Sequence, residues 1–118
     1  MELKVGMYVR FGQVLCQIEE IEDNYISFDR DFYDHWNELT YSMNYDRFIN
    51  DYKPKASYNI IDLIEVGDYV NGYKVDFVQD GYVVFNHNHP YQLNIYPKDI
   101  KSIITKEQFE SMSYKVGE

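Results

Sequence analysis

The chain has 118 residues, of which 45% are hydrophobic and 18% aromatic, which predicts one folded domain or two very small ones and excludes a disordered chain. Twenty acidic residues against eleven basic ones give a net charge of −9, which disfavours nucleic acid or an anionic membrane as a direct partner. The charge favours a partner with a basic surface, although an acidic surface that only provides solubility would have the same composition.

The N-terminal residues MELKVG lack the basic and apolar regions of a signal peptide, and no stretch reaches the roughly 18 apolar residues of a membrane span. We therefore expect a soluble cytoplasmic protein. Cys16 is the single cysteine, which excludes an internal disulfide and a Cys-rich zinc site. It lies in an alternating run and is expected to be a buried apolar side chain rather than a nucleophile.

The pattern V-G-x-Y-V occurs twice, at residues 5–9 and 66–70. Each copy precedes a strand-like run, a polar turn and a second strand with Tyr, a β-branched residue and Phe, which together predict a β-hairpin. The glycine of each copy fits a turn with positive φ before a strand. The predicted hairpin strands are residues 13–18 and 25–28 in the first half, and residues 73–78 and 82–85 in the second half.

Each half has two further strand candidates. Residues 39–45 alternate with a period of two, and residues 91–96 lie at the matching place in the second half. Residues 59–64 and 99–104 are the expected closing strands.

These patterns predict a mainly β protein with two tandem SH3-like small β-barrels packed together and a short C-terminal helix. The expected boundaries are residues 1–64 for the first barrel, which carries an elaborated acidic and aromatic loop segment, residues 65–104 for the second barrel, and residues 105–118 for the helix and tail. One continuous β-sandwich of about ten strands is the competing fold.

A capping box, T-K-E-Q at residues 105–108, predicts the start of the C-terminal helix. Ile104 and Phe109 make a hydrophobic staple, and Phe109, Met112 and Val116 follow helical spacing. The helix is expected from Lys106 to Ser113 and would cover a barrel end or bind a partner.

Residues 29–36, D-R-D-F-Y-D-H-W, follow the first hairpin and combine three carboxylates, an imidazole and three aromatic rings. An elaborated loop on a barrel is a common place for binding residues, so Tyr33 and Trp36 are candidate anchors. The other interpretation is a solvated turn in which these two rings fold back onto the core.

Nearby carboxylates extend this candidate surface. The acidic run at residues 19–23 is expected to continue in space towards the three aspartates, so that the array imitates a phosphate backbone and binds the nucleic-acid-binding surface of another protein. A solvated acidic face is the alternative. The candidate partner-binding residues are Glu19, Glu20, Glu22, Asp23, Asp29, Asp31, Tyr33, Asp34 and Trp36.

Catalysis and metal binding have little support in the sequence. There is no Gly-rich phosphate loop, no zinc-protease motif and no nucleophile elbow. The adjacent carboxylates Glu19 and Glu20 are expected on opposite faces of a strand. A metal site could only combine Asp29, Asp31 or Asp34 with His35, His87 or His89, at spacings typical of no compact motif. We expect a non-enzymatic protein without a metal or cofactor.

Two stretches, I-I-D-L-I-E-V-G-D-Y-V-N-G-Y-K-V (60–75) and D-I-K-S-I-I-T-K-E-Q-F-E-S-M-S-Y-K-V (99–116), are similar to a group of small uncharacterised SH3-like proteins of phages and prophages of low-GC Gram-positive bacteria. The resemblance covers roughly the C-terminal half. It implies a mobile-element origin and a bacterial host cell, and it brings no catalytic residue.

The leading hypothesis is therefore a phage or prophage protein that inhibits a host nucleic-acid-handling defence protein, of the anti-CRISPR or anti-restriction type. A second hypothesis is a homo-oligomeric sponge that sequesters a nucleotide immune signal in Tyr-lined pockets, with Arg10, Arg30 and Arg47 as phosphate-binding candidates. A third is a phage structural or assembly protein.

Overall fold

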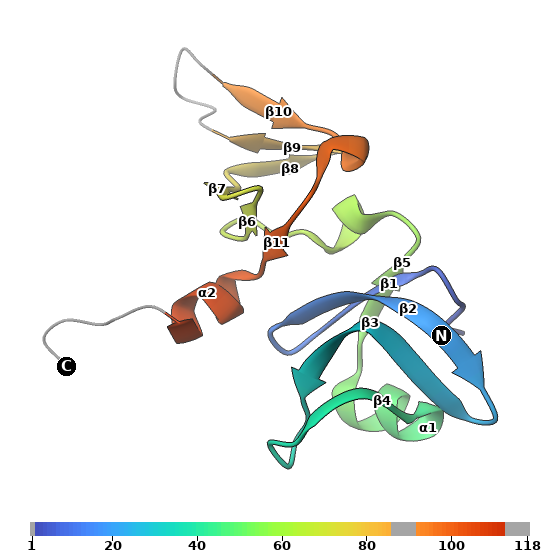
Figure 1. Cartoon of the computed structure of the whole chain (residues 1–118). Helices are drawn as coiled ribbons and strands as arrows, with labels where there is room; N and C mark the ends of the chain where they lie inside the picture. Colours follow the sequence, from blue (N-terminus) through green and yellow to red (C-terminus); the bar gives the residue numbers. More distant parts are fainter. Residues whose placement is uncertain (1, 86–91, 113–118) are drawn as a thin grey trace, which may run out of the picture. The chain divides into compact units, whose positions relative to one another are not determined.

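The computed structural model describes residues 2–85 and 92–112, and the chain divides into two compact units, residues 1–59 and 60–118. Antiparallel strands dominate both units, and a short helix lies towards the C-terminus, which confirms the mainly β prediction (Figure 1). The division falls slightly before the predicted boundary after Ile64, and the second unit includes the C-terminal helix.

The first unit is built on a five-stranded sheet with the order β4-β3-β2-β1-β5. Its two edges, β4 and β5, are not paired with each other, so the sheet is not the closed barrel that the sequence predicts. The elements are β1 (Tyr8–Phe11), β2 (Val14–Glu22), β3 (Tyr25–Tyr33), β4 (Leu39–Asn44), the helical turns α1 (Tyr45–Arg47) and η1 (Phe48–Tyr52), and β5 (Lys55–Ser57).

Phenylalanine rings fill the core of the first unit. Phe48 is fully buried, and its ring centroid lies 5.0 Å from those of Phe11 and Phe28. In this edge-on and tilted packing, attraction between the rings stabilises the core in addition to the burial of their apolar surface. The aromatic residues that the sequence carries in this half are therefore partly a structural feature, and only those outside this cluster are available for binding.

The second unit has two three-stranded sheets, with the orders β11-β6-β7 and β10-β9-β8. Its separate hydrophobic core includes Val70, Val83 and Phe85, so the described residues do not form one continuous sandwich around a shared core. The elements are η2 (Ile60–Leu63), β6 (Tyr69–Val70), β7 (Tyr73–Lys74), β8 (Phe77–Gln79), β9 (Tyr82–Phe85), β10 (Leu93–Ile95), η3 (Pro97–Asp99), β11 (Ile103–Ile104) and α2 (Lys106–Met112).

The two V-G-x-Y-V motifs have the same backbone hydrogen bonds. The N–H of Gly6 donates to the carbonyl of Ile18 and that of Gly67 donates to the carbonyl of Val75, both at 3.0 Å. In return, Ile18 donates to Met7 at 2.8 Å, and Val75 donates to Asp68 at the same distance. Gly6 and Gly67 have φ values of 94° and 97°, a region that L-residues avoid, which confirms the predicted role of these glycines.

The strands of the two units correspond in their pairing. β1 lies between β5 and β2, and β6 lies between β11 and β7. β7 and β8 together take the place of the long strand β2, because β8 pairs with β9 as β2 pairs with β3. The repeat seen in the sequence is therefore a repeat of strand order as well.

One predicted strand is wrong. Residues 59–64 were expected to close the first half, but β5 has that place and residues Ile60–Leu63 form the 3-10 turn η2. The N–H of Ile64 donates to the carbonyl of Ile61 at 3.2 Å, and both side chains are buried in the core of the second unit. The i, i+3 spacing of these two isoleucines fits one helical turn, which a run of apolar residues alone does not distinguish from a strand.

Asp68 fixes the start of α2, which runs over Lys106–Met112. The fully buried carboxylate of Asp68 accepts hydrogen bonds from the N–H groups of Glu65, at 2.7 Å, and Lys106, at 2.8 Å. Thr105 caps the helix as predicted, because its hydroxyl oxygen accepts from the N–H of Gln108 at 3.1 Å.

The side of α2 that carries Phe109 contacts β6. Phe109 stacks on Tyr69 with their ring centroids 4.2 Å apart, so the helix covers part of the second unit. The predicted helix end at Ser113 and the predicted contact of Val116 lie outside the described residues.

Candidate functional site

A β-bulge in β2 brings acidic side chains to one surface. Ile18 pairs with Phe28 and Glu20 pairs with Ser27, so Glu19 is an extra residue with no partner position on β3. Alternation resumes after the bulge, with Ile21 facing inward and Glu22 exposed. Glu19 and Glu20 are consequently both exposed, and the expectation that they lie on opposite faces is wrong because a bulge interrupts the period of two.

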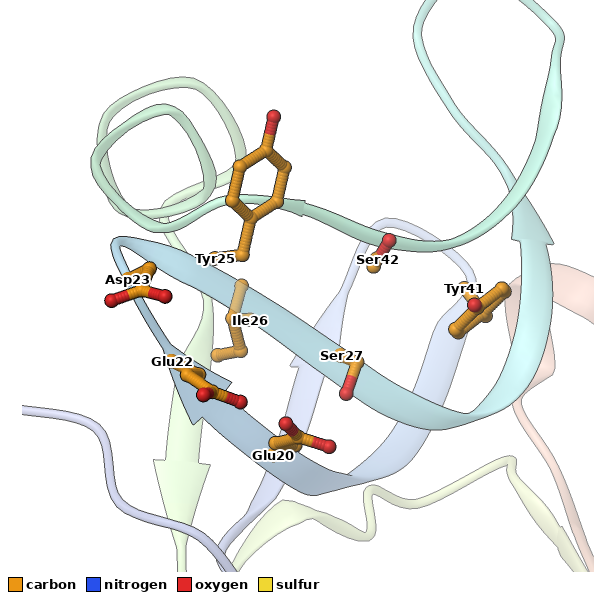
Figure 2. A pocket seen from close by; sticks show the side chains of 8 residues that line it. All are labelled: Glu20, Glu22, Asp23, Tyr25, Ile26, Ser27, Tyr41 and Ser42. Carbon is orange, nitrogen blue, oxygen red and sulfur yellow. The ribbon is translucent and has the colours of Figure 1, made fainter.

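A groove of about 340 Å³ lies on the outer face of the sheet over β2, β3 and β4, and we call it the β2–β4 groove (Figure 2). Glu20 and Glu22 line it from β2 (Figure 2). Tyr25 and Tyr41 contribute rings that are each 59% exposed. Its volume is within the range of small-ligand sites. The groove is lined by Glu20, Glu22, Asp23, Tyr25, Ile26, Ser27, Tyr41 and Ser42.

The carboxylates of the groove repel one another. A hydrogen bond with Glu22 and the charge of Glu22 raise the pKa of Glu20 above its usual range, and the charge of Glu19 adds to the shift. Repulsion from like charges on the same face of the strand disfavours the charged form of Glu20. A cation bound in the groove would relieve this repulsion, so the groove is chemically suited to a positively charged ligand.

The β3–β4 hairpin tip is an ordered turn. Asp34 organises it, because one of its carboxylate oxygens accepts from the N–H groups of Trp36 and Glu38, both at 2.9 Å. The carbonyl of Asp34 also accepts from the N–H of Asn37, which has a positive φ of 60°. Asp34 thus has a structural role in the turn, and Tyr33 and Trp36 remain 64% and 61% exposed.

Side chains of α1 and η1 support this tip. The guanidinium carbon of Arg47 lies 3.7 Å from the ring centroid of Trp36, and His35 stacks on Tyr52 at 4.1 Å. The N–H of His35 also donates to the hydroxyl of Tyr52 at 3.1 Å. Trp36 therefore folds back onto Arg47 rather than onto the core, and most of its ring stays exposed to solvent.

The remaining acidic candidates lie farther along β3. Asp29 accepts a hydrogen bond from the N–H of Gln17 at 2.9 Å, which satisfies the backbone next to the bulge. Asp31 is exposed, and its carbonyl accepts from Nε of Arg30 at 3.5 Å. The structure thus brings Glu20, Glu22 and Asp23 together in the groove, whereas Asp29, Asp31 and Asp34 occupy the second half of β3 and the tip.

The three candidate phosphate-binding arginines are on three different elements. Arg10 is on β1 and only 5% exposed, Arg30 is exposed on β3, and Arg47 lies against Trp36 on α1. The structure therefore gives no direct support to an anion pocket formed by all three.

The described residues offer little support for a reactive thiol or a metal site. Burial, followed by the charge of Asp29, raises the pKa of the Cys16 thiol to about 12, which leaves it protonated at neutral pH. Across residues 2–85 and 92–112, no three His, Cys, Asp or Glu side chains are grouped to hold a metal ion, and His87 and His89 lie outside this part. No helix in the same ranges is both long and apolar enough to cross a membrane.

Sequence reasoning missed most of the groove lining. The lining residues that were not among the candidates are Tyr25, Ile26, Ser27, Tyr41 and Ser42. Their places follow from the β3–β4 register, in which Ser27 pairs with Ser42. The sequence signal for them is the alternation of residues 25–28 and 39–43. Alternation predicts which side chains share one face of the sheet, but it does not predict which residues of the neighbouring strand lie beside them.

No protein-family model matches the chain, and no curated protein or solved structure is significantly similar to it.

Proposed function

We propose that the protein is a non-enzymatic binding protein of phage or prophage origin that acts in the cytoplasm of a bacterial host. It would bind a host defence protein that handles nucleic acid, of the anti-CRISPR or anti-restriction type, and block the basic surface that this protein uses for nucleic acid. The acidic and aromatic surface of the first unit would make the contact.

The β2–β4 groove is the observation that supports this proposal most. Exposed carboxylates on β2 lie beside two exposed tyrosine rings, and a net charge of −9 extends the negative potential over the chain. Charges of this kind guide a basic partner into contact and speed association. Exposed rings such as Trp36 supply the area that binding hot spots need.

We also infer that each unit is SH3-like in its strand connectivity, with open sheets in place of a closed barrel. The shared strand order, with β1 and β6 in matching positions and a helical turn before each closing strand, supports this interpretation. A scaffold of this kind would present the β3–β4 hairpin and the groove on rigid strands.

Competition tests the proposal. The immobilised protein would be exposed to nuclease-treated lysate of a low-GC Gram-positive host, and the retained proteins identified by mass spectrometry. A retained protein that elutes with salt would then be purified and mixed with a fluorescent oligonucleotide. We expect this protein to displace the oligonucleotide, with weaker displacement at 0.5 M salt because exposed charges are screened. A retained protein that keeps its oligonucleotide would contradict the proposal.

A variant pair makes the test specific. Glu20→Gln/Glu22→Gln removes two charges from the groove, and Glu2→Gln/Glu38→Gln removes two exposed charges outside it. If the acidic surface acts as proposed, the groove variant displaces the oligonucleotide less well than the control variant. Equal displacement by both would mean that net charge alone is responsible.

A further inference from the structure

We propose that the β2–β4 groove binds an arginine side chain of the protein partner. Glu20 and Glu22 would hold the guanidinium, and the exposed rings of Tyr25 and Tyr41 line other parts of the same groove (Figure 2). The inference rests on the proposed function, because it specifies the chemistry at one point of the surface that meets a basic partner.

The groove combines carboxylates with rings and hydroxyl groups. A guanidinium is planar and donates paired hydrogen bonds to carboxylates, and it also stacks on aromatic faces. Glu20 and Glu22 alternate along one face of β2 with Ile21 turned inward, so both carboxylates are available to one cation. Ser27 and Ser42, which pair across β3 and β4, add hydroxyl oxygens to the floor of the groove. An ammonium group would satisfy the charge but would not make the paired hydrogen bonds.

Strand pairing does not require these two carboxylates. The repeat supplies the comparison, because Phe77 pairs with Val84 on the strands where Glu20 pairs with Ser27. Gln79 likewise pairs with Tyr82 where Glu22 pairs with Tyr25. The second unit therefore builds the same strand positions with an aromatic ring and a neutral amide.

The two carboxylates lie close together although strand pairing does not need them. A hydrogen bond with Glu22, followed by the charge of Glu22, raises the pKa of Glu20, and the second unit forms the counterpart of this arrangement without either carboxylate. Side chains that do not favour the local structure, such as neighbouring like charges on one strand face, are expected where a protein binds its ligand. The groove has this character, and a guanidinium would convert the repulsion into attraction.

An NMR titration of the full chain tests the site, with N-acetyl-arginine methylamide as the probe. We expect saturable chemical-shift changes at Tyr25, Ser27, Tyr41 and Ser42. The corresponding lysine derivative should bind at least about threefold more weakly, because it cannot make the paired hydrogen bonds. The neutral citrulline derivative, which has nearly the shape of arginine, should produce no saturable change. Changes spread over all acidic residues, or equal for arginine and citrulline, would overturn the proposal.

Variants give a second measurement. Glu20→Gln/Glu22→Gln should weaken binding of the arginine probe about tenfold, which corresponds to the loss of two exposed ion pairs. The same variant should melt at a higher temperature than the control Glu2→Gln/Glu38→Gln, because the repulsion is gone. A purely structural role of the two carboxylates predicts a lower melting temperature instead. Unchanged affinity in the groove variant would therefore refute the site even if the fold is intact.

Failure here can be told apart from failure of the proposed function. If the protein still displaces an oligonucleotide from a salt-eluted host protein but the arginine probe does not bind the groove, then the proposed function stands and the arginine site is wrong. If the probe binds the groove but no host protein loses its oligonucleotide, the site stands as a cation site and the inhibitor proposal fails.

Discussion

Asp68→Asn should destabilise the second unit strongly. The fully buried carboxylate accepts hydrogen bonds from the N–H groups of Glu65 and Lys106, at 2.7 and 2.8 Å. In the variant, one oxygen becomes an amide donor that faces an N–H, and the other bond loses its charge. Hydrogen bonds to charged groups are worth roughly 1.5–3 kcal/mol, so the free energy of unfolding should fall by about 3 kcal/mol.

Amide hydrogen exchange measures this effect in each unit separately, which matters because two units need not unfold together. Protection should fall in the second unit, first at Lys106 and Phe109 at the start of α2, while the first unit keeps its protection. Asp80→Asn is the matched control, since it removes the same charge from an exposed turn. If Asp68→Asn and Asp80→Asn agree within about 0.5 kcal/mol, the role assigned to the buried carboxylate is wrong.

Three further predictions concern the first unit. The pKa of Cys16 is raised to about 12, so above about pH 9 the folded state keeps a proton that the unfolded state loses. The free energy of unfolding should therefore be unaffected below about pH 9 and fall above it by up to 1.4 kcal/mol per pH unit. Denaturant titrations of Cys16→Ala should lack this contribution to the slope. Phe48→Ala should lower the free energy of unfolding by about 3–5 kcal/mol, measured by loss of exchange protection in β1–β4. Arg47→Gln should alter the fluorescence of Trp36, the single tryptophan. It should lower stability by about 1 kcal/mol, because the guanidinium is half-buried against a ring that is itself 61% exposed.

The sequence predicts local features of the fold well. The repeated glycines, the capping threonine and the strand at residues 39–44 follow from turn chemistry, capping and alternation, all of which depend on neighbours in the chain. The segment at residues 59–64 was misread because its apolar residues fit either a strand or one turn of helix. Whether this segment forms a strand or a helical turn depends on how its isoleucines pack in the core of the second unit, and local sequence patterns do not contain that information.

The candidate site was predicted in part. The acidic residues Glu20 and Glu22 were identified from charge, whereas Tyr25 and Tyr41 were missed because their neighbours are set by strand register. Asp34 has the composition of a binding residue but holds the backbone of the hairpin tip. Short polar side chains in turns often bond to nearby N–H groups, and sequence alone does not separate that role from binding.

The bulge at Glu19 separates the backbone of the groove from its charge. Asp76 holds the matching place in the second unit, between β7 and β8, where its N–H donates to the carbonyl of Val84 at 2.9 Å. The two units therefore follow one strand order with different side chains on it. The acidic groove is a property of the side chains on β2, and exchanging those side chains for the ones on β8 should remove the negative charge while the strand pairing stays the same.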